Sequence, residues 1–491
     1  MRVSFRLCTA LAVVALPCAA QTLAKRVDAI LASGRAASRS SWGIKVVELA
    51  TGKTLYDRNG SHWFVPASNT KLFSTSLALT RLGPDYRFHT TVRATSEPDG
   101  SGRIAGDVVL AGSGDPTLSS RTIPYVKDDP QRFGGNPLAA LEELADQVAA
   151  RGVRLVEGSV VGDDTRYVWE PYPDGWSADD PLWEYGAPVS ALTINDNCFQ
   201  LTLHPGAGSG DPVSLSMVPP LEHYIIHNLV RTAPAERIRI SRELGSRELV
   251  LRGALPPSGA PYSTILAIDD PALYAARALT LALVRRGITV RGEPHARHRE
   301  ASEPESPAAG VELARRSSPP LVETLRIVDK VSQNLEAELV LRAAGYERRT
   351  EGTRQAAIEE LKAFLEEAGA LKDGQFFEDA SGLSRLNLIS PDTITRLLVY
   401  MHKSSNRDAW LSLLPVGGED GTLASRFAGA SQARNIRAKT GSLTHVNCLS
   451  GYVESRRRGR LAFSIMVNNS NAPSAEIRGV IDKIALILVQ L

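Results

Sequence analysis

The stretch that decides the fold is VPASNTKLFST, residues 65–75, in which Lys71 follows Ser68 by three places. Residues three apart at the start of a helix share a face, so the amine of Lys71 is expected beside the hydroxyl of Ser68. A serine becomes a nucleophile when such a base lies within hydrogen-bond reach. The alternative is a helix cap next to a solvated lysine, because about two Ser-x-x-Lys spacings arise by composition alone in a chain of this size. The helix is predicted to continue with inward-facing positions at Leu72, Thr75, Leu79 and Leu82.

The segments nearest the two ends of the chain predict one shared sheet. Residues 42–59, WGIKVVELATGKTLYDRN, alternate apolar and polar side chains around a Thr-Gly turn, which is typical of a hairpin. Residues 448–455 and 460–469 form a second predicted hairpin around the basic turn RRRGR. A terminal helix follows, and its uncharged end, 484–491, is predicted to dock on the sheet, with a peripheral membrane contact as the alternative.

The middle of the chain has a different pattern and is predicted to be an insertion of one or two smaller α/β modules. A polar stretch rich in proline and alanine, residues 298–310, indicates a linker or surface loop. The expected divisions are a signal peptide at 1–20, a first domain part at 21–96, inserted domains at 97–300 and a second domain part at 301–491. Within the insertion, strands are expected at Leu155–Val161, Ser190–Ile194, Phe199–Leu203 and Glu248–Leu251, and helices at Leu138–Ala150 and Pro271–Arg286.

A second motif, Ser332-Gln333-Asn334, lies after the insertion. Its hydroxyl could relay a proton between a base and a leaving group, and its amide could bind a substrate carbonyl. The triplet at 404–406, Ser-Ser-Asn, has the same spacing, but it follows a predicted helix end, so we expect an exposed turn there. A single Ser-x-Asn is weak evidence for a site, and the motif gains weight only from its neighbours.

A third motif, Lys439-Thr440-Gly441-Ser442, precedes an apolar strand and is therefore expected at a sheet edge. A lysine and a hydroxyl could hold a carboxylate there, and the glycine permits a close backbone approach. The alternative is a plain turn, since a Lys-Thr-Gly triplet arises by chance about one time in ten at this length. The three motifs occur in the order found in β-lactamases and penicillin-binding proteins.

The composition is that of an exported globular protein. A chain of 491 residues is expected to form two to four domains, and 43% hydrophobic and 22% charged residues are globular values. The first twenty residues, MRVSFRLCTALAVVALPCAA, have the basic start, apolar run and small residues of a cleaved signal peptide. Of the 56 basic residues two leave with that signal, so the remainder equals the 54 acidic ones. This balance favours no nucleic-acid partner.

Two cysteines, Cys198 and Cys448, remain after removal of the signal. Two cysteines so far apart form no disulfide framework, and the sequence leaves open whether they pair or are buried. The chain has no Cys/His spacing typical of zinc, so neither a metal nor a cofactor is expected. The sequence does not determine the oligomeric state.

With these motifs in view, the chain resembles the class C low-molecular-mass penicillin-binding proteins, the D-alanyl-D-alanine carboxypeptidase/endopeptidases of the cell wall. The similarity also covers GDVVLAGSGDPTL, YGAPVSALTINDN, EDASGLSRLNLISP and LPVGGEDGTL, which extend over nearly the whole mature chain. The resemblance implies an α/β fold: a serine transpeptidase/β-lactamase-like domain interrupted by a large insertion between the first and second motifs.

The resemblance also implies a role for each motif residue. Ser68 is expected to be the acylated nucleophile and Lys71 its general base, kept neutral with the help of the second lysine. Ser332 and Asn334 are expected to be the proton relay and the substrate-binding amide. Lys439 and Thr440 are expected to hold the terminal carboxylate of the substrate. The backbone N–H groups of Ser68 and Ser442 are expected to form the oxyanion hole.

Two further positions bear on catalysis and on substrate binding. The middle residue of the second motif is usually aspartate in this family, and here it is Gln333, a change of charge that could alter the pKa of the general base or the preference for substrate. In VGDDTRYV, an acidic residue is expected to face the free amino group of the substrate. Asp164 is the first choice and Asp163 the second, and the alternative for both is a role in a turn.

The predicted function is that of a serine-type D-alanyl-D-alanine carboxypeptidase, with endopeptidase action on cross-links as a further expectation. Its expected partners are peptidoglycan stem peptides, with β-lactams as inhibitors, in the periplasm or cell envelope. A β-lactamase is the first alternative, opposed by the lack of a second acidic base segment. The second alternative is a catalytically silent cell-wall-binding protein of the same fold. A Ser-His-Asp hydrolase is not favoured, because the sequence contains no Gly-x-Ser-x-Gly nucleophile elbow.

Overall fold

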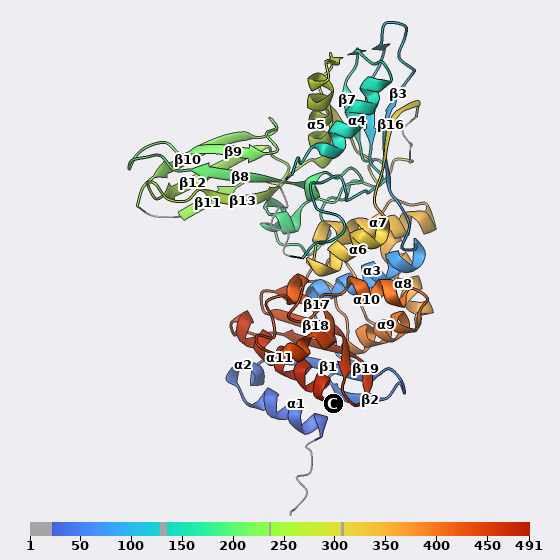
Figure 1. Ribbon diagram of the computed structural model, residues 1–491, viewed down its shortest axis with the longest axis vertical. Coiled ribbons are helices and arrows are strands. Elements are labelled where there is room, and N and C mark those ends of the chain that lie inside the picture. Colours follow the sequence, from blue (N-terminus) through green and yellow to red (C-terminus); the bar gives the residue numbers. More distant parts are fainter. Residues whose placement is uncertain (1–21, 128–134, 235–236, 306–308) are drawn as a thin grey trace, which may run out of the picture.

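The computed structural model describes residues 22–127, 135–234, 237–305 and 309–491. The predicted signal peptide at 1–20 lies outside the described residues. Figure 1 shows a lower part that contains both ends of the described chain and an upper part formed by its middle. No helix among the described residues is long and apolar enough to cross a membrane.

The lower part is built on one five-stranded sheet, in the order β17-β18-β19-β1-β2. Its neighbouring strands are antiparallel, and β1 at the start of the chain pairs with β19 near its end. Both predicted hairpins are confirmed, because β1 pairs with β2 and β18 with β19. The strands span Ser41–Glu48 (β1), Thr54–Arg58 (β2), Ile436–Leu443 (β17), Val446–Ser455 (β18) and Gly459–Asn468 (β19).

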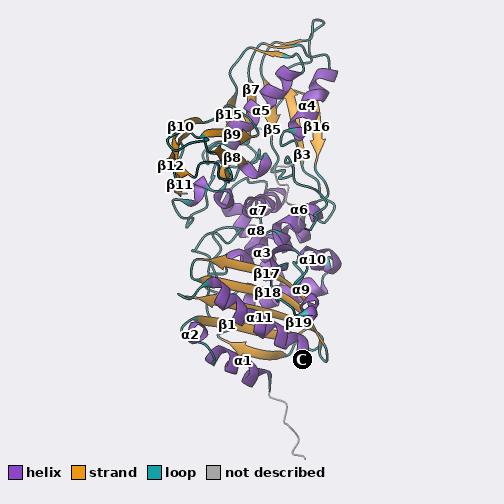
Figure 2. Ribbon diagram, turned by 60° about the vertical axis from the view of Figure 1, so that its left-hand side comes forward, coloured by secondary structure: helices purple, strands orange, loops and turns teal. Residues whose placement is uncertain are grey.

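Helices cover both faces of this sheet (Figure 2). On one face the C-terminal helix α11 (Ser474–Gln490) packs with α1 (Leu23–Ala32) and α2 (Arg35–Ser38). Most of the apolar end of α11 is buried in the core on this face of the sheet, as predicted. The opposite face is covered by α3 (Lys71–Arg81), α6 (Leu321–Lys330), α7 (Asn334–Arg349), α8 (Arg354–Glu367), α9 (Pro391–Lys403) and α10 (Arg407–Leu413).

The inserted part contains a second five-stranded sheet, in the order β15-β7-β5-β3-β16. Helices α4 (Ala139–Ala150) and α5 (Pro271–Arg285) pack on it in one hydrophobic core. A small sheet, β14-β6-β4, lies in the same core. The strands are β3 (His89–Ala94), β4 (Arg103–Ile104), β5 (Val108–Ala111), β6 (Leu155–Val156), β7 (Val160–Asp163), β14 (Thr289–Val290), β15 (His295–Arg297) and β16 (Val311–Ser317).

Two three-stranded sheets, β13-β8-β9 and β10-β12-β11, project sideways from the insertion (Figure 1). The insertion meets the lower part where Cys198 and its neighbours pack against Leu335 and Leu339 of α7. The strands are β8 (Cys198–His204), β9 (Ser214–Val218), β10 (Ile225–Thr232), β11 (Arg237–Ser241), β12 (Glu248–Leu255) and β13 (Tyr262–Ala267).

The strands that flank the insertion belong to its sheet. β3 and β16 are antiparallel neighbours, with Ala94 opposite Val311 and His89 opposite Ser317. The division drawn at 97 and 300 assigned both strands to the other domain, because the sequence of a strand does not reveal which strand it pairs with. We propose limits near residues 88 and 318, where the chain crosses between the two cores.

Two predicted strands differ from the structure. The strand expected at Leu155–Val161 is divided into β6 and β7, which belong to different sheets. The other expected strand is absent: residues 190–194 form bends and irregular backbone instead, where the Ser190 hydroxyl accepts a hydrogen bond from the N–H of Leu192 at 3.1 Å. Serine side chains that bond the nearby backbone compete with a strand ladder in this way. Cys198 and Cys448 do not pair with each other, and both are buried.

Candidate active site

The first motif lies where a 3-10 turn, Ala67–Thr70, runs into α3. Ser68 is in the turn and Lys71 is the first residue of the α-helix. Ala67 has a φ of 47°, a left-handed conformation that is strained for a residue with a side chain and recurs at functional sites. The turn brings the two side chains together as predicted, with Lys71 Nζ 3.0 Å from Ser68 Oγ.

The Lys71 amine is fully buried and contacts three oxygen atoms. It donates to Asn334 Oδ1 and to the carbonyl oxygen of Ser381, both at 2.6 Å, and its third contact is with the Ser68 hydroxyl. Burial, followed by the charge of Lys439, holds the pKa of Lys71 well below its usual value, since both disfavour the ammonium form. The lysine is therefore suited to accept a proton from the serine that it contacts.

The second motif forms the bend between α6 and α7. Ser332 has a φ of 65°, and Asn334 is the first residue of α7. The side-chain oxygen of Gln333 accepts a hydrogen bond from the N–H of Glu336 at 2.8 Å, so this unusual residue caps the helix. Asn334 uses both ends of its amide, because Nδ2 donates to the carbonyl of Tyr185 in the insertion at 2.8 Å while Oδ1 faces Lys71.

The third motif lies on β17, the edge strand of the lower sheet, as predicted. Lys439 is buried, and its amine donates to Ser332 Oγ at 2.8 Å, which joins the second and third motifs. Burial lowers the pKa of Lys439 to about 8. Asn69, next to Ser68, donates to the Lys439 carbonyl at 2.9 Å and ties the strand to the turn of the first motif.

The glycine of the third motif permits a close approach within the protein itself. A Cβ atom on Gly441 would lie 2.8 Å from the Pro66 carbonyl oxygen and 3.1 Å from the Ser68 backbone nitrogen. Contacts under 3.0 Å to backbone force something to shift. Gly441 therefore sets how closely β17 lies against the turn that carries Ser68.

A cleft opens on both sides of Ser68. One compartment, of about 420 Å³, is lined by Asn334 and by residues of the insertion. The other, of about 340 Å³, is lined by Ser332, Thr440 and two arginines. Ser68 and Ser442 line both compartments, so the predicted nucleophile is reached from either side.

The acidic residues chosen in VGDDTRYV lie elsewhere. Asp164 is buried, accepts a hydrogen bond from the Ser190 hydroxyl at 2.8 Å and faces His298 Nδ1 at 3.0 Å. Asp163 pairs with Arg297 and accepts from the N–H of Thr165, which is the turn role held as the alternative. Neither is among the described residues that line the cleft at Ser68.

Asp179 and Asp180 line that cleft instead, and Arg385 also lines it. Asp179 is exposed and Asp180 is buried, and burial raises the pKa of Asp180 above its usual value. The sequence analysis missed this pair. The only signal was two adjacent acids in a stretch rich in Trp, Pro and Gly, which carries no periodic structure.

Three further acids lie near the two lysines and were also missed. Their charges oppose the lowering of the Lys71 pKa. Burial raises the pKa of Asp329 and of Glu338 to about 7, so each binds a proton more readily than a surface acid does. Glu338 also accepts the N–H of Ser381, whose carbonyl holds the Lys71 amine. The three are Asp329, Glu338 and Asp379.

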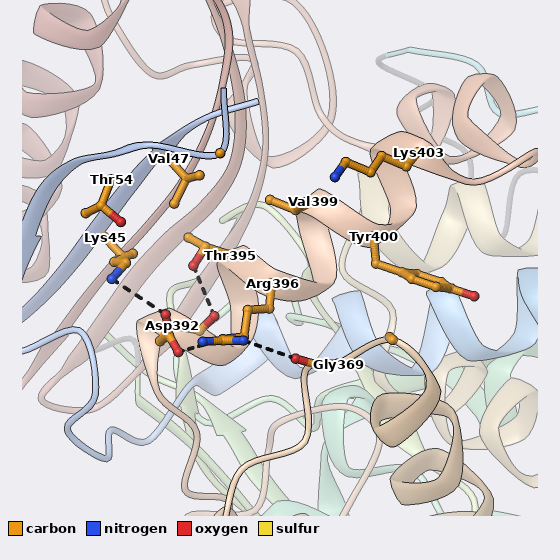
Figure 3. Close-up of a pocket in the computed structure, with 12 residues that line it drawn as sticks. Lys45, Val47, Thr54, Gly369, Asp392, Thr395, Arg396, Val399, Tyr400 and Lys403 are labelled. Atoms are coloured by element: carbon orange, nitrogen blue, oxygen red, sulfur yellow. Dashed lines mark hydrogen bonds and ion pairs between the residues drawn. The ribbon is translucent and has the colours of Figure 1, made fainter. Parts of the chain in front are cut away.

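Another pocket of about 540 Å³ lies between β1, β2 and α9, and Figure 3 shows its lining. Its carboxylate, Asp392, accepts from Arg396 Nε at 2.8 Å and lies 3.6 Å from Lys45 Nζ. No serine or cysteine is among the described residues that line it, and these residues offer no counterpart of the Ser68–Lys71 pair. The turn at Ser404–Asn406 lies between α9 and α10, as predicted, and is not part of the cleft.

The model of the D-Ala-D-Ala carboxypeptidase 3 (S13) family matches residues 23–488. The chain belongs to this family. As a member of the S13 family it is a serine-type D-Ala-D-Ala carboxypeptidase and hence a hydrolase. The resemblance stated from the motifs is thereby confirmed.

Individual relatives agree with this assignment. The S13 chain is 33% identical over 466 residues to a D-alanyl-D-alanine carboxypeptidase of an Actinomadura species, covering 92% of this chain and 82% of the relative. It is 25% identical to the D-alanyl-D-alanine carboxypeptidase DacB of Haemophilus influenzae, covering 89% and 87%. The crystal structure of penicillin-binding protein 4 from Haemophilus influenzae has the same fold, with a TM-score of 0.81 at 23% identity over 96% of this chain and 99% of that one.

Proposed function

We propose that this S13 carboxypeptidase removes the terminal D-alanine of peptidoglycan stem peptides through an acyl-enzyme on Ser68. The observation that carries the proposal is the contact of 3.0 Å between Ser68 Oγ and the buried Lys71 amine, whose pKa is held low. A neutral lysine at that distance can accept the hydroxyl proton. Cleavage of peptide cross-links at the same serine belongs to the proposal as its endopeptidase part.

The proposed acylation moves one proton from Ser68 to the leaving nitrogen, and its first step uses the contact between Ser68 and Lys71. Lys71 accepts the proton of Ser68 as Oγ forms a bond to the carbonyl carbon of the penultimate D-alanine. The C–N bond then breaks, and the proton held by Lys71 reaches the departing nitrogen through the Ser332 hydroxyl, which gives up one proton and regains one. D-alanine therefore leaves as an amine, and Lys71 is neutral again. In the second half, Lys71 takes a proton from water, hydroxide attacks the ester, and the proton returns to Ser68 Oγ.

Substrate binding is assigned to the residues around the nucleophile. Lys439, as an ammonium, and the Thr440 hydroxyl hold the terminal carboxylate, while Asn334 binds an amide of the peptide. The backbone N–H groups of Ser68 and Ser442 stabilise the oxyanion. The close approach that Gly441 allows between β17 and the turn of Ser68 supports this pairing of donors.

We also assign the recognition of a free amino group on the stem peptide to Asp179 and Asp180, in place of Asp164. Both line the compartment on the Asn334 side of Ser68. The proposed location is the periplasm or cell envelope, after export by the predicted signal peptide. Benzylpenicillin and other β-lactams are the proposed inhibitors, since they acylate the same serine.

The test of this function is the intact mass of the protein after a short incubation with benzylpenicillin, together with D-alanine release from a pentapeptide. We expect one penicillin mass on the wild type and none on Ser68→Ala, with D-alanine release lost in that variant by at least about 10³-fold. Ser405→Ala, in the exposed turn, is the matched control and should behave as wild type.

Other outcomes separate the alternatives. Penicillin consumed without a lasting adduct would identify a β-lactamase. No adduct and intact penicillin, with no D-alanine released, would indicate a silent cell-wall-binding protein of the same fold.

A further inference from the structure

The two compartments of the cleft differ in charge. The one beside Asn334 contains Asp179 and Asp180 with a single arginine, whereas the one beside Thr440 contains Arg426 and Arg478 and no acid among its described lining residues. Since Lys439 and Thr440 are assigned to the terminal carboxylate, the leaving group of the reaction enters the second compartment. That compartment is therefore the positive side of the active site.

The two arginines have different surroundings. Arg426 forms an ion pair with Asp482 of α11, which neutralises it, and both side chains are at least four-fifths buried. Arg478 is exposed at the mouth, and within the described part of the chain no carboxylate lies at ion-pair distance from it. Arg426 also donates to the Arg478 carbonyl at 3.5 Å, so it supports the backbone that carries the unneutralised charge.

Arg478 is held over the cleft by a chain of hydrogen bonds. Its Nε donates to Ser474 Oγ at 3.1 Å, and Ser474 donates to Asn447 Oδ1 at 2.6 Å. The Ser442 hydroxyl contacts the same amide oxygen at 3.4 Å. The chain uses only the Nε of the guanidinium, and its two terminal nitrogens stay available for a carboxylate, which such a fork binds with two parallel hydrogen bonds.

We propose that this basic compartment binds an anionic leaving peptide, and that Arg478 is the residue that selects cross-linked substrates over terminal D-alanine. The inference rests on the proposed function and extends its endopeptidase part. The volume of about 340 Å³ falls in the range of pockets that hold drug-sized ligands, roughly 300–1,000 Å³, and is more than a single alanine fills.

The chemistry of the leaving group explains the need for a second cation. D-alanine carries one carboxylate, and Lys439 and Thr440 are enough to hold it. When the scissile amide joins two stem peptides, the departing amine belongs to a peptide with further free carboxylates. The C–N bond breaks as before, the amine takes its proton through Ser332, and Arg478 binds a carboxylate that D-alanine lacks.

The experiment compares two substrates on the same enzyme: a monomeric pentapeptide and a purified cross-linked muropeptide dimer. For each variant, kcat/KM is measured for D-alanine release and for cleavage of the dimer, and the ratio of the two is the readout. We expect Arg478→Glu to lower the ratio of dimer to monomer by about tenfold, because the variant puts a like charge against the leaving peptide. Arg478→Lys keeps the charge but loses the two parallel hydrogen bonds, so its ratio should lie between those of the wild type and Arg478→Glu.

The matched control is Arg457→Glu, an exposed arginine in the turn between β18 and β19, which should leave the ratio at the wild-type value. An unchanged ratio in Arg478→Glu would overturn the proposal. An equal loss on both substrates would also overturn it, since Arg478 would then bind the carboxylate common to both. A wild type that releases D-alanine but leaves dimers intact would refute this inference alone, whereas failure of Ser68 to be acylated would refute the proposed function as well.

Discussion

At the scale of the residue, the main physical question is how a lysine becomes a base. Lys71 achieves this by complete burial beside a second lysine, and its three oxygen contacts fix the direction of its amine. Three acids nearby oppose this lowering of the Lys71 pKa. Lys439 keeps a pKa of about 8 and is therefore charged near neutral pH.

The rate of acylation by benzylpenicillin is expected to have a bell-shaped dependence on pH. On the acid side the rate falls as pH drops through the lowered pKa of Lys71, because the ammonium cannot accept the Ser68 proton. On the alkaline side it falls as pH rises through about 8, because Lys439 loses the charge that holds the ligand carboxylate. Stopped-flow acylation between about pH 5 and 10 measures both limbs.

Lys439→Gln is the control for the alkaline limb. This variant should be slower at every pH and should show no fall on the alkaline side, because no charge is left to lose. A wild-type rate that keeps rising above about pH 9 would show that the charge of Lys439 is not required.

At the scale of the element, the site depends on how β17 lies against the turn of the first motif. A side chain on Gly441 meets the Pro66 carbonyl and the Ser68 nitrogen, neither of which can rotate away. The turn is already strained at Ala67, so it has little freedom to yield. The lack of a Cβ atom at Gly441 therefore sets the distance between β17 and the turn that carries Ser68.

We expect Gly441→Ala to slow acylation of Ser68 by about 100-fold, because a displacement of about 1 Å at the reacting groups has an effect of that size. Gly479→Ala, in α11, is the matched control: a Cβ there meets nothing within 4 Å, so the rate should not change. Acylation rates with benzylpenicillin, and melting temperatures to verify folding, measure the effect. A folded Gly441→Ala protein with the wild-type rate would contradict this account of the strand.

At the scale of the whole molecule, the insertion contributes to the active site. The carbonyl of Tyr185 accepts from Asn334 Nδ2 at 2.8 Å, and Asp179 and Asp180 form one wall of the cleft. The insertion also shares a buried cluster with α7, the helix that begins at Asn334. Its position therefore affects both the binding amide and the selection of substrate.

Asp179→Asn is expected to raise KM about threefold for a peptide with a free amino group on its third residue, with kcat little changed. The effect is modest because Asp179 is exposed and solvent screens its charge. Acylation by benzylpenicillin, which has no such amine, should not change. Asp174→Asn, in the same loop and outside the lining of the cleft, is the control. An equal change with both ligands would show that the loop acts on the nucleophile instead.

The chemical groups of the site follow from the sequence, because each motif is local. Ser68 and Lys71 are three residues apart and meet across one helical turn, and the alternating patterns of the terminal hairpins predict the sheet. Only the tertiary structure brings Asn334 to Lys71, across 263 positions, and Lys439 to Ser332, across 107.

The same difference between local sequence and tertiary packing explains why the sequence pointed to Asp164 and not to Asp179. Asp164 and Asp179 are both acids in turns, and no local pattern separates the one that pairs with His298 inside the insertion from the one that lines the cleft. The sequence by itself determined which reacting groups the protein carries. The packing of the two cores decided which charged residues face these groups. Burial and contacts between distant segments, rather than spacing along the chain, determine the pKa of each group and the residues that line the cleft.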